Sequence, residues 1–393
     1  MEHFANAKAM IAARRPDRAV FGVRPHAAGR AARWFVEQFP GEVAYAYKAN
    51  SSVFLIGALY GAGIRNFDVA SLPELEDAAT IPRAQLHFMH PVKSRTAIRR
   101  AYHEFGVRCF ALDSEEELRK IVDETGAPKD LQLFVRLAVP AMNSGVPLER
   151  KFGIEEGQGA SDLLVRARQY CDELGVMFHV GSQTTQVDSY DNAFGVVHRS
   201  IVSAGVVVDA IDVGGGFPAR YGEDAPAPLQ DFVDLIVRRF EELPVSTDCR
   251  LICEPGRALV AEAESLIVRV NARRGAELFV NDGAYGALFD AAQLGFAFPM
   301  RHIGEDGRPS SREMMDFSFW GPTCDSIDHM RGPFRLPADI REGDYIEIGN
   351  LGAYGRAISG QFNGYGRYEE VILEDEPMYS MYASNVHPLA QDG

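Results

Sequence analysis

Short apolar runs alternate with amphipathic stretches over the first two thirds of the chain. Eight runs have the length and composition of buried β-strands: Val43–Tyr47, Asn66–Val69, Gln85–Met89, Arg108–Leu112, Leu131–Leu137, Val176–Val180, Val208–Val213 and Leu251–Glu254. Between them, apolar residues return every three or four positions, which predicts helices: Leu72–Ala79, Ser114–Thr125, Ala160–Leu174 and Asp231–Leu243. Eight successive strand–helix units predict an α/β fold, a (β/α)8 TIM-like barrel. An open doubly wound sheet alternates in the same way and is the alternative.

The pattern changes after about residue 263. Ser265–Arg273, Glu277–Asn281 and Asp344–Ile348 alternate or run apolar between Gly, Pro and Asn turns. This predicts a second, mainly antiparallel β domain. Gly332–Asp344 holds two prolines and several charges and is predicted to be a loop. We expect the barrel to span residues 24–262, and residues 1–23 plus 263–393 to form a β-sandwich or barrel-like domain.

Composition narrows the class of protein. The 393 residues are 46% hydrophobic and 24% charged, which is typical of a globular protein of about two domains. The net charge of -15 and the lack of a basic run argue against a nucleic-acid partner. No apolar stretch reaches the roughly 18 residues of a membrane span. Met1–Arg15 has no signal-peptide pattern, so we expect a cytoplasmic protein. Five cysteines without a CxxC pair, and histidines without HExxH spacing, predict neither disulfides nor a metal site.

Lys48 is the most informative residue, because it stands directly after the apolar run Val43–Tyr47. Lysine is rarely buried without a partner. Its ammonium either reaches water along an apolar stem or has a chemical role. Desolvation lowers the pKa of an ammonium, and a neutral amine can attack an aldehyde such as that of pyridoxal 5′-phosphate (PLP).

The ends of other predicted strands carry groups that suit the same cofactor, since ligands of a barrel lie at these ends. Gly214-Gly215-Gly216 could present backbone N–H groups to an anion, or simply form a tight turn. In Glu254-Pro255-Gly256-Arg257, the carboxylate could face the ring nitrogen and the guanidinium could bind phosphate, with Gly256 allowing close approach. A structural ion pair between Glu254 and Arg257 is the alternative.

Further candidates follow another strand and lie in the β region. His179 could lie flat against the cofactor ring or be a core histidine, and Ser182 could cap a helix or donate to a phosphate. Cys324 and Asp325 share the polar turn Gly321–Asp325, although a lone cysteine is usually packing. Tyr354, after the run Asp344–Ile348, could reach a phosphate with its phenol.

These motifs form an ordered set over nearly the whole chain: Tyr47-Lys48-Ala49-Asn50, Phe67-Asp68-Val69-Ala70-Ser71, Lys151-Phe152-Gly153, Phe178-His179-Val180-Gly181-Ser182, Asp212 to Pro218, Glu254-Pro255-Gly256-Arg257, Asn281-Asp282-Gly283, Gly321 to Asp325 and Phe362-Asn363-Gly364. The set resembles that of the alanine-racemase-fold (fold type III) PLP enzymes. Within them it is closest to the eukaryotic-type ornithine/lysine/diaminopimelate decarboxylases, and among these to the ornithine decarboxylases.

The resemblance implies a role for each matching position. Lys48 would carry the cofactor, His179 would stack on its ring, and Glu254 would pair with the ring nitrogen. The phosphate and the remaining cofactor contacts would fall to Ser182, Gly215, Gly216, Gly256, Arg257, Tyr354, Asp68 and Arg136.

The resemblance also implies a homodimer with shared active sites. Cys324 and Asp325 would be lent by one subunit to the site of the other. The counterpart of Cys324 in the family protonates the substrate carbon after carbon dioxide leaves, and that of Asp325 binds the distal amine. Tyr285, in the Asn-Asp-Gly-x-Tyr-Gly motif, would be a further substrate contact.

The expected reaction is therefore decarboxylation of a basic L-amino acid. Racemases of this fold place an arginine near the ring nitrogen, whereas this chain has Glu254. Diaminopimelate decarboxylases usually carry an acidic residue before the equivalent cysteine, whereas Gly321-Pro322-Thr323 precedes Cys324 in this chain. L-Ornithine, giving putrescine for polyamine biosynthesis, is the first candidate and L-lysine the second. Ornithine decarboxylases carry a second substrate aspartate that Ala287–Phe296 lacks, although Asp290 is nearby. A conjugated diamino acid (of the carboxynorspermidine or siderophore-intermediate type) is thus an alternative substrate, and a catalytically dead regulatory homologue is a third hypothesis.

Overall fold

The computed structural model describes residues 1–146 and 151–382. Within them, eight parallel strands close into a barrel in the order β11-β12-β3-β4-β5-β6-β7-β9. They are β3 (Glu42–Ala46), β4 (Asn66–Val69), β5 (Gln85–Phe88), β6 (Cys109–Leu112), β7 (Gln132–Arg136), β9 (Glu173–Met177), β11 (Ala210–Asp212) and β12 (Arg250–Cys253). Pairing of β12 with β3, with Ile252 opposite Glu42, completes the ring. The TIM-like barrel is confirmed and the open doubly wound sheet is wrong.

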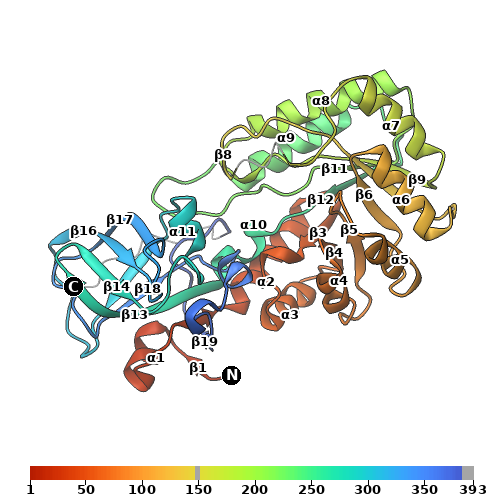
Figure 1. Cartoon of the computed structure of the whole chain (residues 1–393). Coiled ribbons are helices and arrows are strands. Elements are labelled where there is room, and N and C mark those ends of the chain that lie inside the picture. Colours follow the sequence, from red (N-terminus) through yellow and green to blue (C-terminus); the bar gives the residue numbers. More distant parts are fainter. Residues whose placement is uncertain (147–150, 383–393) are drawn as a thin grey trace.

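Helices form the outer layer of the barrel, on the right of Figure 1. They are α2 (Pro25–Gln38), α3 (Val53–Gly61), α4 (Leu72–Ala78), α5 (Arg95–His103), α6 (Glu115–Thr125), α7 (Gln158–Arg168), α8 (Asp188–Ala204), α9 (Leu229–Glu241) and α10 (Arg257–Val260). Serine starts three of them, because its side chain accepts from the backbone N–H three residues later. Two of these caps, Ser71 with Glu74 and Ser114 with Glu117, follow the capping-box spacing.

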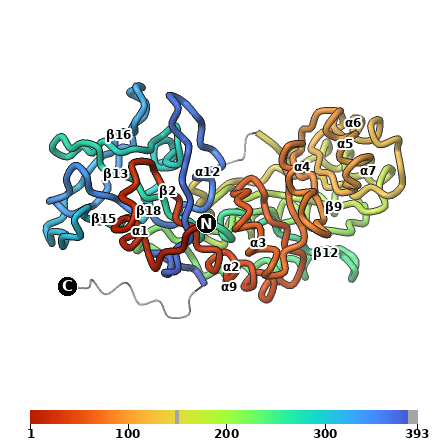
Figure 2. Tube along the Cα trace, turned by 90° about the horizontal axis from the view of Figure 1, so that it is seen from below, coloured from red at the N-terminus to blue at the C-terminus, as the bar shows by residue number. Residues whose placement is uncertain are grey.

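The second body is a mainly antiparallel sheet of nine strands, on the left of Figure 1. Its strands are β1 (His3–Phe4), β2 (Val20–Val23), β13 (Glu264–Arg274), β14 (Glu277–Val280), β15 (Met300–Ile303), β16 (Met314–Trp320), β17 (His329–Pro337), β18 (Tyr345–Ile348) and β19 (Glu369–Leu373). Both ends of the described chain enter this sheet, since β2 pairs with β13 and with β19. Figure 2 shows the N-terminal segment with α1 (Ala7–Arg14) running beside these later strands.

Two predictions about local structure are wrong. The predicted helix Ala160–Leu174 ends at Arg168, and its last residues enter β9 because Glu173 and Leu174 pair with β7. The predicted loop Gly332–Asp344 is strand as far as Pro337. Proline has no backbone N–H to donate to a neighbouring strand. It is tolerated there because the β16–β17 register shifts between Phe317 and Phe319, and a residue in such a bulge does not need to pair.

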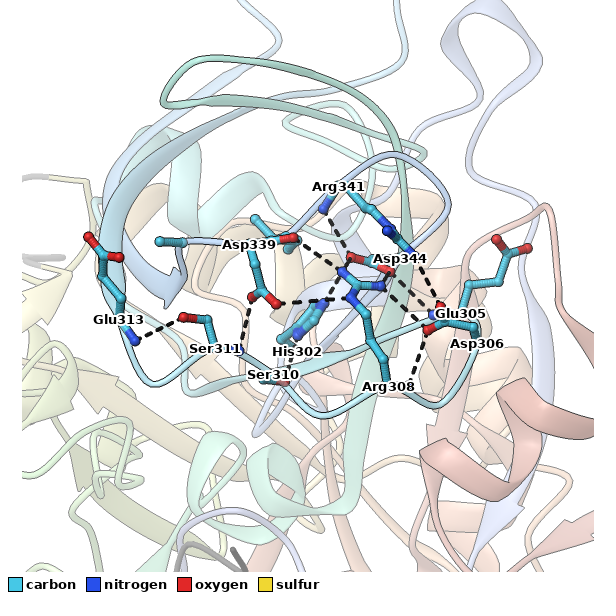
Figure 3. A network of polar contacts seen from close by, with 12 residues as sticks. His302, Glu305, Asp306, Arg308, Ser310, Ser311, Glu313, Asp339, Arg341 and Asp344 are labelled. Carbon is cyan, nitrogen blue, oxygen red and sulfur yellow. Dashed lines mark hydrogen bonds and ion pairs between the residues drawn. The ribbon is translucent and has the colours of Figure 1, made fainter.

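A polar network fixes the connection between β15 and β16 onto β18 (Figure 3). Its centre is Asp344, whose side chain is buried. Asp344 accepts from Arg308 Nη1 at 2.7 Å, lies 3.0 Å from His302 Nε2, and accepts from the backbone N–H of Arg341 at 2.9 Å. These donors hold the pKa of Asp344 well below its usual range, even though burial acts in the opposite direction. The network therefore holds the connection between β15 and β16 against the start of β18.

Among residues 1–146 and 151–382, no helix is both long and apolar enough to span a bilayer. The same part of the chain holds no group of three His, Cys, Asp or Glu side chains with metal-binding geometry.

Candidate active site

Lys48 lies in a short 3-10 turn, η1 (Tyr47–Ala49), directly after β3. Contacts from the β domain fix this turn. Asn50 donates to the carbonyl of Gly352 at 2.7 Å and to Glu264 at 2.9 Å, and the backbone N–H of Tyr354 donates to the carbonyl of Ala49 at 2.9 Å. The carboxyl end of the barrel therefore meets the β domain at Lys48, whose side chain remains 39% exposed.

One cavity at this junction gathers most of the predicted site residues. Its walls are formed by Ala46, Lys48, His179, Ser182, Gly215, Gly216, Glu254, Gly256, Arg257 and Tyr354. The structure thus brings together strand ends that are far apart in the sequence. Asp68, at the end of β4, contacts Lys48 directly. Arg136, the last residue of β7, is close enough to His179 to act on its pKa.

The charge of Lys48 differs from the expectation drawn from burial alone. Burial does lower the pKa of its ammonium, but the negative charge of Asp68 and further groups raise it by more, and the net shift is upward. The Asp68 carboxylate accepts from Nζ at 2.8 Å. Lys48 is therefore an ammonium in this state, and the Asp68 carboxylate stabilises it.

Glu254 forms a carboxyl pair with Asp212, at the end of β11. Burial and then the charge of Asp212 raise the pKa of Glu254 well above its usual value, and burial raises the pKa of Asp212 to about 7. Oε1 of Glu254 is buried and has no hydrogen-bond donor among the described residues. A proton shared with Asp212, or an N–H of a bound ring, would satisfy it. Sequence reasoning missed Asp212 as a site residue, although it directly precedes Val213 and the triple glycine.

The triple glycine leaves room for an anion. A Cβ at Gly215 would lie 2.7 Å from the carbonyl of Glu254 and 3.3 Å from Nε2 of His179. Gly216 has a φ of +113°, which side chains rarely adopt. Ser182 and Arg257 lie on the same wall, with Arg257 Nε donating to Ser182 Oγ at 3.3 Å. This cradle of backbone N–H groups, hydroxyl and guanidinium fits a phosphate.

Arg257 does not pair with Glu254, so the structural ion pair considered from the sequence is wrong. Among the described residues its ion-pair partner is Asp290, with Nη2 and Oδ2 3.4 Å apart. Nη1 donates to the Tyr221 hydroxyl at 2.7 Å. Glu254 and Arg257 therefore have different partners, Asp212 and Asp290.

His179 presents a neutral ring to the cavity. Burial lowers its pKa well below the ordinary value, and the positive charges of Arg136 and Lys48 lower it further. Nδ1 accepts from the backbone N–H of Gly181 at 3.1 Å, which fixes the orientation of the ring. A neutral, held imidazole suits stacking on a flat cofactor.

Cys324, Asp325 and Tyr285 lie outside this cavity. Cys324 is exposed, and its backbone N–H donates to Asn363 at 3.1 Å. Asp325 accepts from the Tyr285 hydroxyl at 2.6 Å, and this bond lowers the pKa of the carboxylate. Cys324 and Asp325 line a separate hollow with Trp320 and Phe279. Within one described protomer, the structure does not bring this cluster to Lys48.

A closed barrel with a lysine, a carboxyl pair and a phosphate cradle at one end defines a PLP-binding enzyme of the barrel type. The sequence profile of a family described as "Pyridoxal-dependent decarboxylase, pyridoxal binding domain" matches residues 27–261. The chain therefore belongs to this family, and it is a PLP-dependent amino-acid decarboxylase.

Relatives extend the match beyond the barrel. The chain is 29% identical to a lysine/ornithine decarboxylase of Selenomonas ruminantium, covering 86% of this chain and 85% of that protein. It is 31% identical to a diaminopimelate decarboxylase of Pseudomonas aeruginosa, covering 87% and 83%. The crystal structure of a lysine decarboxylase from Selenomonas ruminantium superposes with a TM-score of 0.80 at 25% identity, over 95% of this chain and 97% of that one.

Proposed function

We propose that this enzyme decarboxylates L-ornithine to putrescine as a cytoplasmic step of polyamine biosynthesis, with L-lysine, which would give cadaverine, as the second candidate substrate. The observation that carries the proposal is the placement of Glu254 and Lys48 on the wall of one cavity, backed by Asp212 and Asp68. A carboxyl at the ring nitrogen favours an electron sink strong enough for loss of carbon dioxide. The half-buried, anionic Asp325 suits the distal ammonium of a diamino acid.

Each wall residue has a part in this reaction. When bound, PLP supplies the electron sink for the pair released at the substrate Cα. Lys48 would hold the cofactor at its aldehyde carbon, and the Asp68 carboxylate would keep Nζ in place and stabilise its ammonium form. The neutral His179 ring would cover one face of the cofactor and exclude water from it. Ser182, Arg257 and Tyr354 would hold the phosphate end together with the backbone of Gly215 and Gly216.

We also propose that the active unit is a homodimer with shared sites. Cys324 and Asp325 lie on an exposed turn away from the cavity of their own protomer, which supports their delivery to the cavity of a partner. There the Cys324 thiol would give its proton to Cα after carbon dioxide leaves, and Asp325, oriented by Tyr285, would bind the distal amine.

A specific observation favours a second candidate substrate, a conjugated diamino acid. Asp290 is engaged by Arg257, so Asp325 is left without a second carboxylate for the distal amine. A hollow beside Ser326 is lined by Gln293, His329 and Arg331 and has no carboxylate among its lining residues. Such a hollow suits a neutral or anionic extension of the substrate better than a second ammonium. A dead regulatory homologue is disfavoured because the cofactor wall is complete.

The test is carbon dioxide release by the PLP-loaded protein from L-ornithine, L-lysine, L-arginine and meso-diaminopimelate in parallel, with Lys48→Ala as the inactive control. Efficient release from ornithine or lysine supports the proposal. Slow release from all four, with the cofactor bound through Lys48, would reject it in favour of a conjugated substrate. Failure of the purified protein to bind PLP would favour the regulatory homologue.

A further inference from the structure

The guanidinium of Arg257 is enclosed by aromatic rings. Its guanidinium carbon lies 5.0 Å from the ring centroids of both Phe296 and Tyr354, and 5.8 Å from that of Tyr221. The residue is only 4% exposed. A buried guanidinium requires a compensating negative charge, because burying an unpaired ion is costly.

Asp290 supplies that charge. It lies in the short helix α11 (Phe289–Gln293), is 7% exposed, and faces Arg257 with 3.4 Å between Oδ2 and Nη2. Among the described residues, no other side chain donates to this carboxylate. Asp290 therefore belongs to the guanidinium rather than to the distal end of a substrate.

The position of Asp290 has a consequence for the phosphate. Arg257, Ser182, Gly215 and Gly216 line the cavity, and Asp290, which is not one of its lining residues, contacts the guanidinium through Nη2. A phosphate that binds this wall must share Arg257 with a carboxylate that is already paired to it. In a buried setting, like charges held by one cation repel each other strongly.

We propose that Asp290 sets the affinity of this site for phosphate monoesters. Without phosphate it neutralises Arg257 and stabilises the protein; with phosphate it competes for the same guanidinium and weakens binding. It is a positioning residue that keeps the cofactor exchangeable. The inference rests on the proposed function in one respect, the assignment of Arg257 to the phosphate.

The two effects have opposite signs, which makes the inference testable with Asp290→Asn. Asparagine keeps the volume and removes the charge. The expected result is a cofactor-free protein that melts at a lower temperature than wild type, yet binds PLP and inorganic phosphate at least about tenfold more tightly by calorimetry. Asp316→Asn, an exposed aspartate of β16, is the matched control and should change neither quantity.

Equal or weaker phosphate binding by a folded Asp290→Asn variant would overturn the inference. Arg257→Ala separates this failure from that of the proposed function. If Arg257→Ala loses phosphate affinity while Asp290→Asn does not gain it, only the role of Asp290 is rejected. If Arg257→Ala binds phosphate as wild type does, the phosphate assignment fails as well, and the proposed arrangement of the cofactor fails with it.

Discussion

Oδ2 of Asp68 accepts a hydrogen bond from Nζ of Lys48 at 2.8 Å. The two residues are 20 positions apart, but β3 and β4 are adjacent and parallel, with Ala46 opposite Asp68. The turn after β3 therefore places the lysine over the end of β4. Burial lowers the pKa of Lys48, but this contact and the other negative groups around Nζ together outweigh burial and raise the pKa.

Replacing Asp68 by Asn should change the pH dependence of cofactor attachment. Because Asp68 raises the pKa of Lys48, little neutral amine is present near neutral pH in the wild type, and attachment speeds up as pH rises. In Asp68→Asn the pKa falls, so the visible band of the lysine-bound cofactor should form about tenfold faster at neutral pH. Rapid-mixing absorbance measures the rate. Glu76→Gln, on the exposed face of α4, is the control, and an unchanged pH profile would contradict the prediction.

Glu254→Gln should leave the cofactor bound but slow turnover about 100-fold or more, because an amide cannot hold a proton for the ring nitrogen as the carboxyl pair does. Asp212→Asn should have a smaller effect in the same direction, since Asp212 acts through Glu254. Steady-state kinetics with L-ornithine, combined with the bound-cofactor spectrum, measures both. A Gln variant with wild-type kcat would remove the ring-nitrogen role from Glu254.

Mixing two inactive variants should restore activity if the sites are shared. Lys48→Ala removes the lysine that would hold the cofactor, and Cys324→Ala removes the thiol that would come from the other subunit. In a homodimer that exchanges subunits freely, half of the dimers are mixed and each contains one intact site, so roughly a quarter of wild-type activity should return. Carbon dioxide release before and after mixing measures it. No recovery, despite subunit exchange seen by native mass spectrometry, would place Cys324 in the site of its own protomer.

Asp344→Asn should destabilise the β domain by about 3 kcal/mol, because it leaves Arg308 without its buried partner. Asp339→Asn, at the exposed rim of the network in Figure 3, should cost less than about 1 kcal/mol. The folded-state pKa of Asp344 is lowered, so its stabilisation is present above the unfolded pKa of about 3.9 and is lost as pH falls below it. Urea unfolding at neutral and acidic pH measures both variants. Equal effects of the two substitutions would contradict the central role of Asp344 in the network.

The sequence by itself determined the barrel, the class of the second domain and most of the cavity wall. Strand–helix alternation is a local pattern, and Lys48, His179, Glu254 and Arg257 each sit at a fixed offset from an apolar run. Because a parallel barrel brings the carboxyl ends of all its strands to one rim, these offsets were enough to predict that the four residues lie close together. The Cys324-Asp325 motif could also be recognised in the sequence, but its position relative to the cavity could not.

Only the tertiary structure decided which charged side chains pair with each other. The pairing of Glu254 with Asp212, of Arg257 with Asp290, and of Lys48 with Asp68 joins different strands or different domains, and no local spacing encodes it. The same holds for the strand through Pro333, which a bulge in β17 itself permits. Charge balance in a buried site depends on distances between chain segments, so the direction of the Lys48 pKa shift and the partner of Asp290 could be known only once the segments were packed.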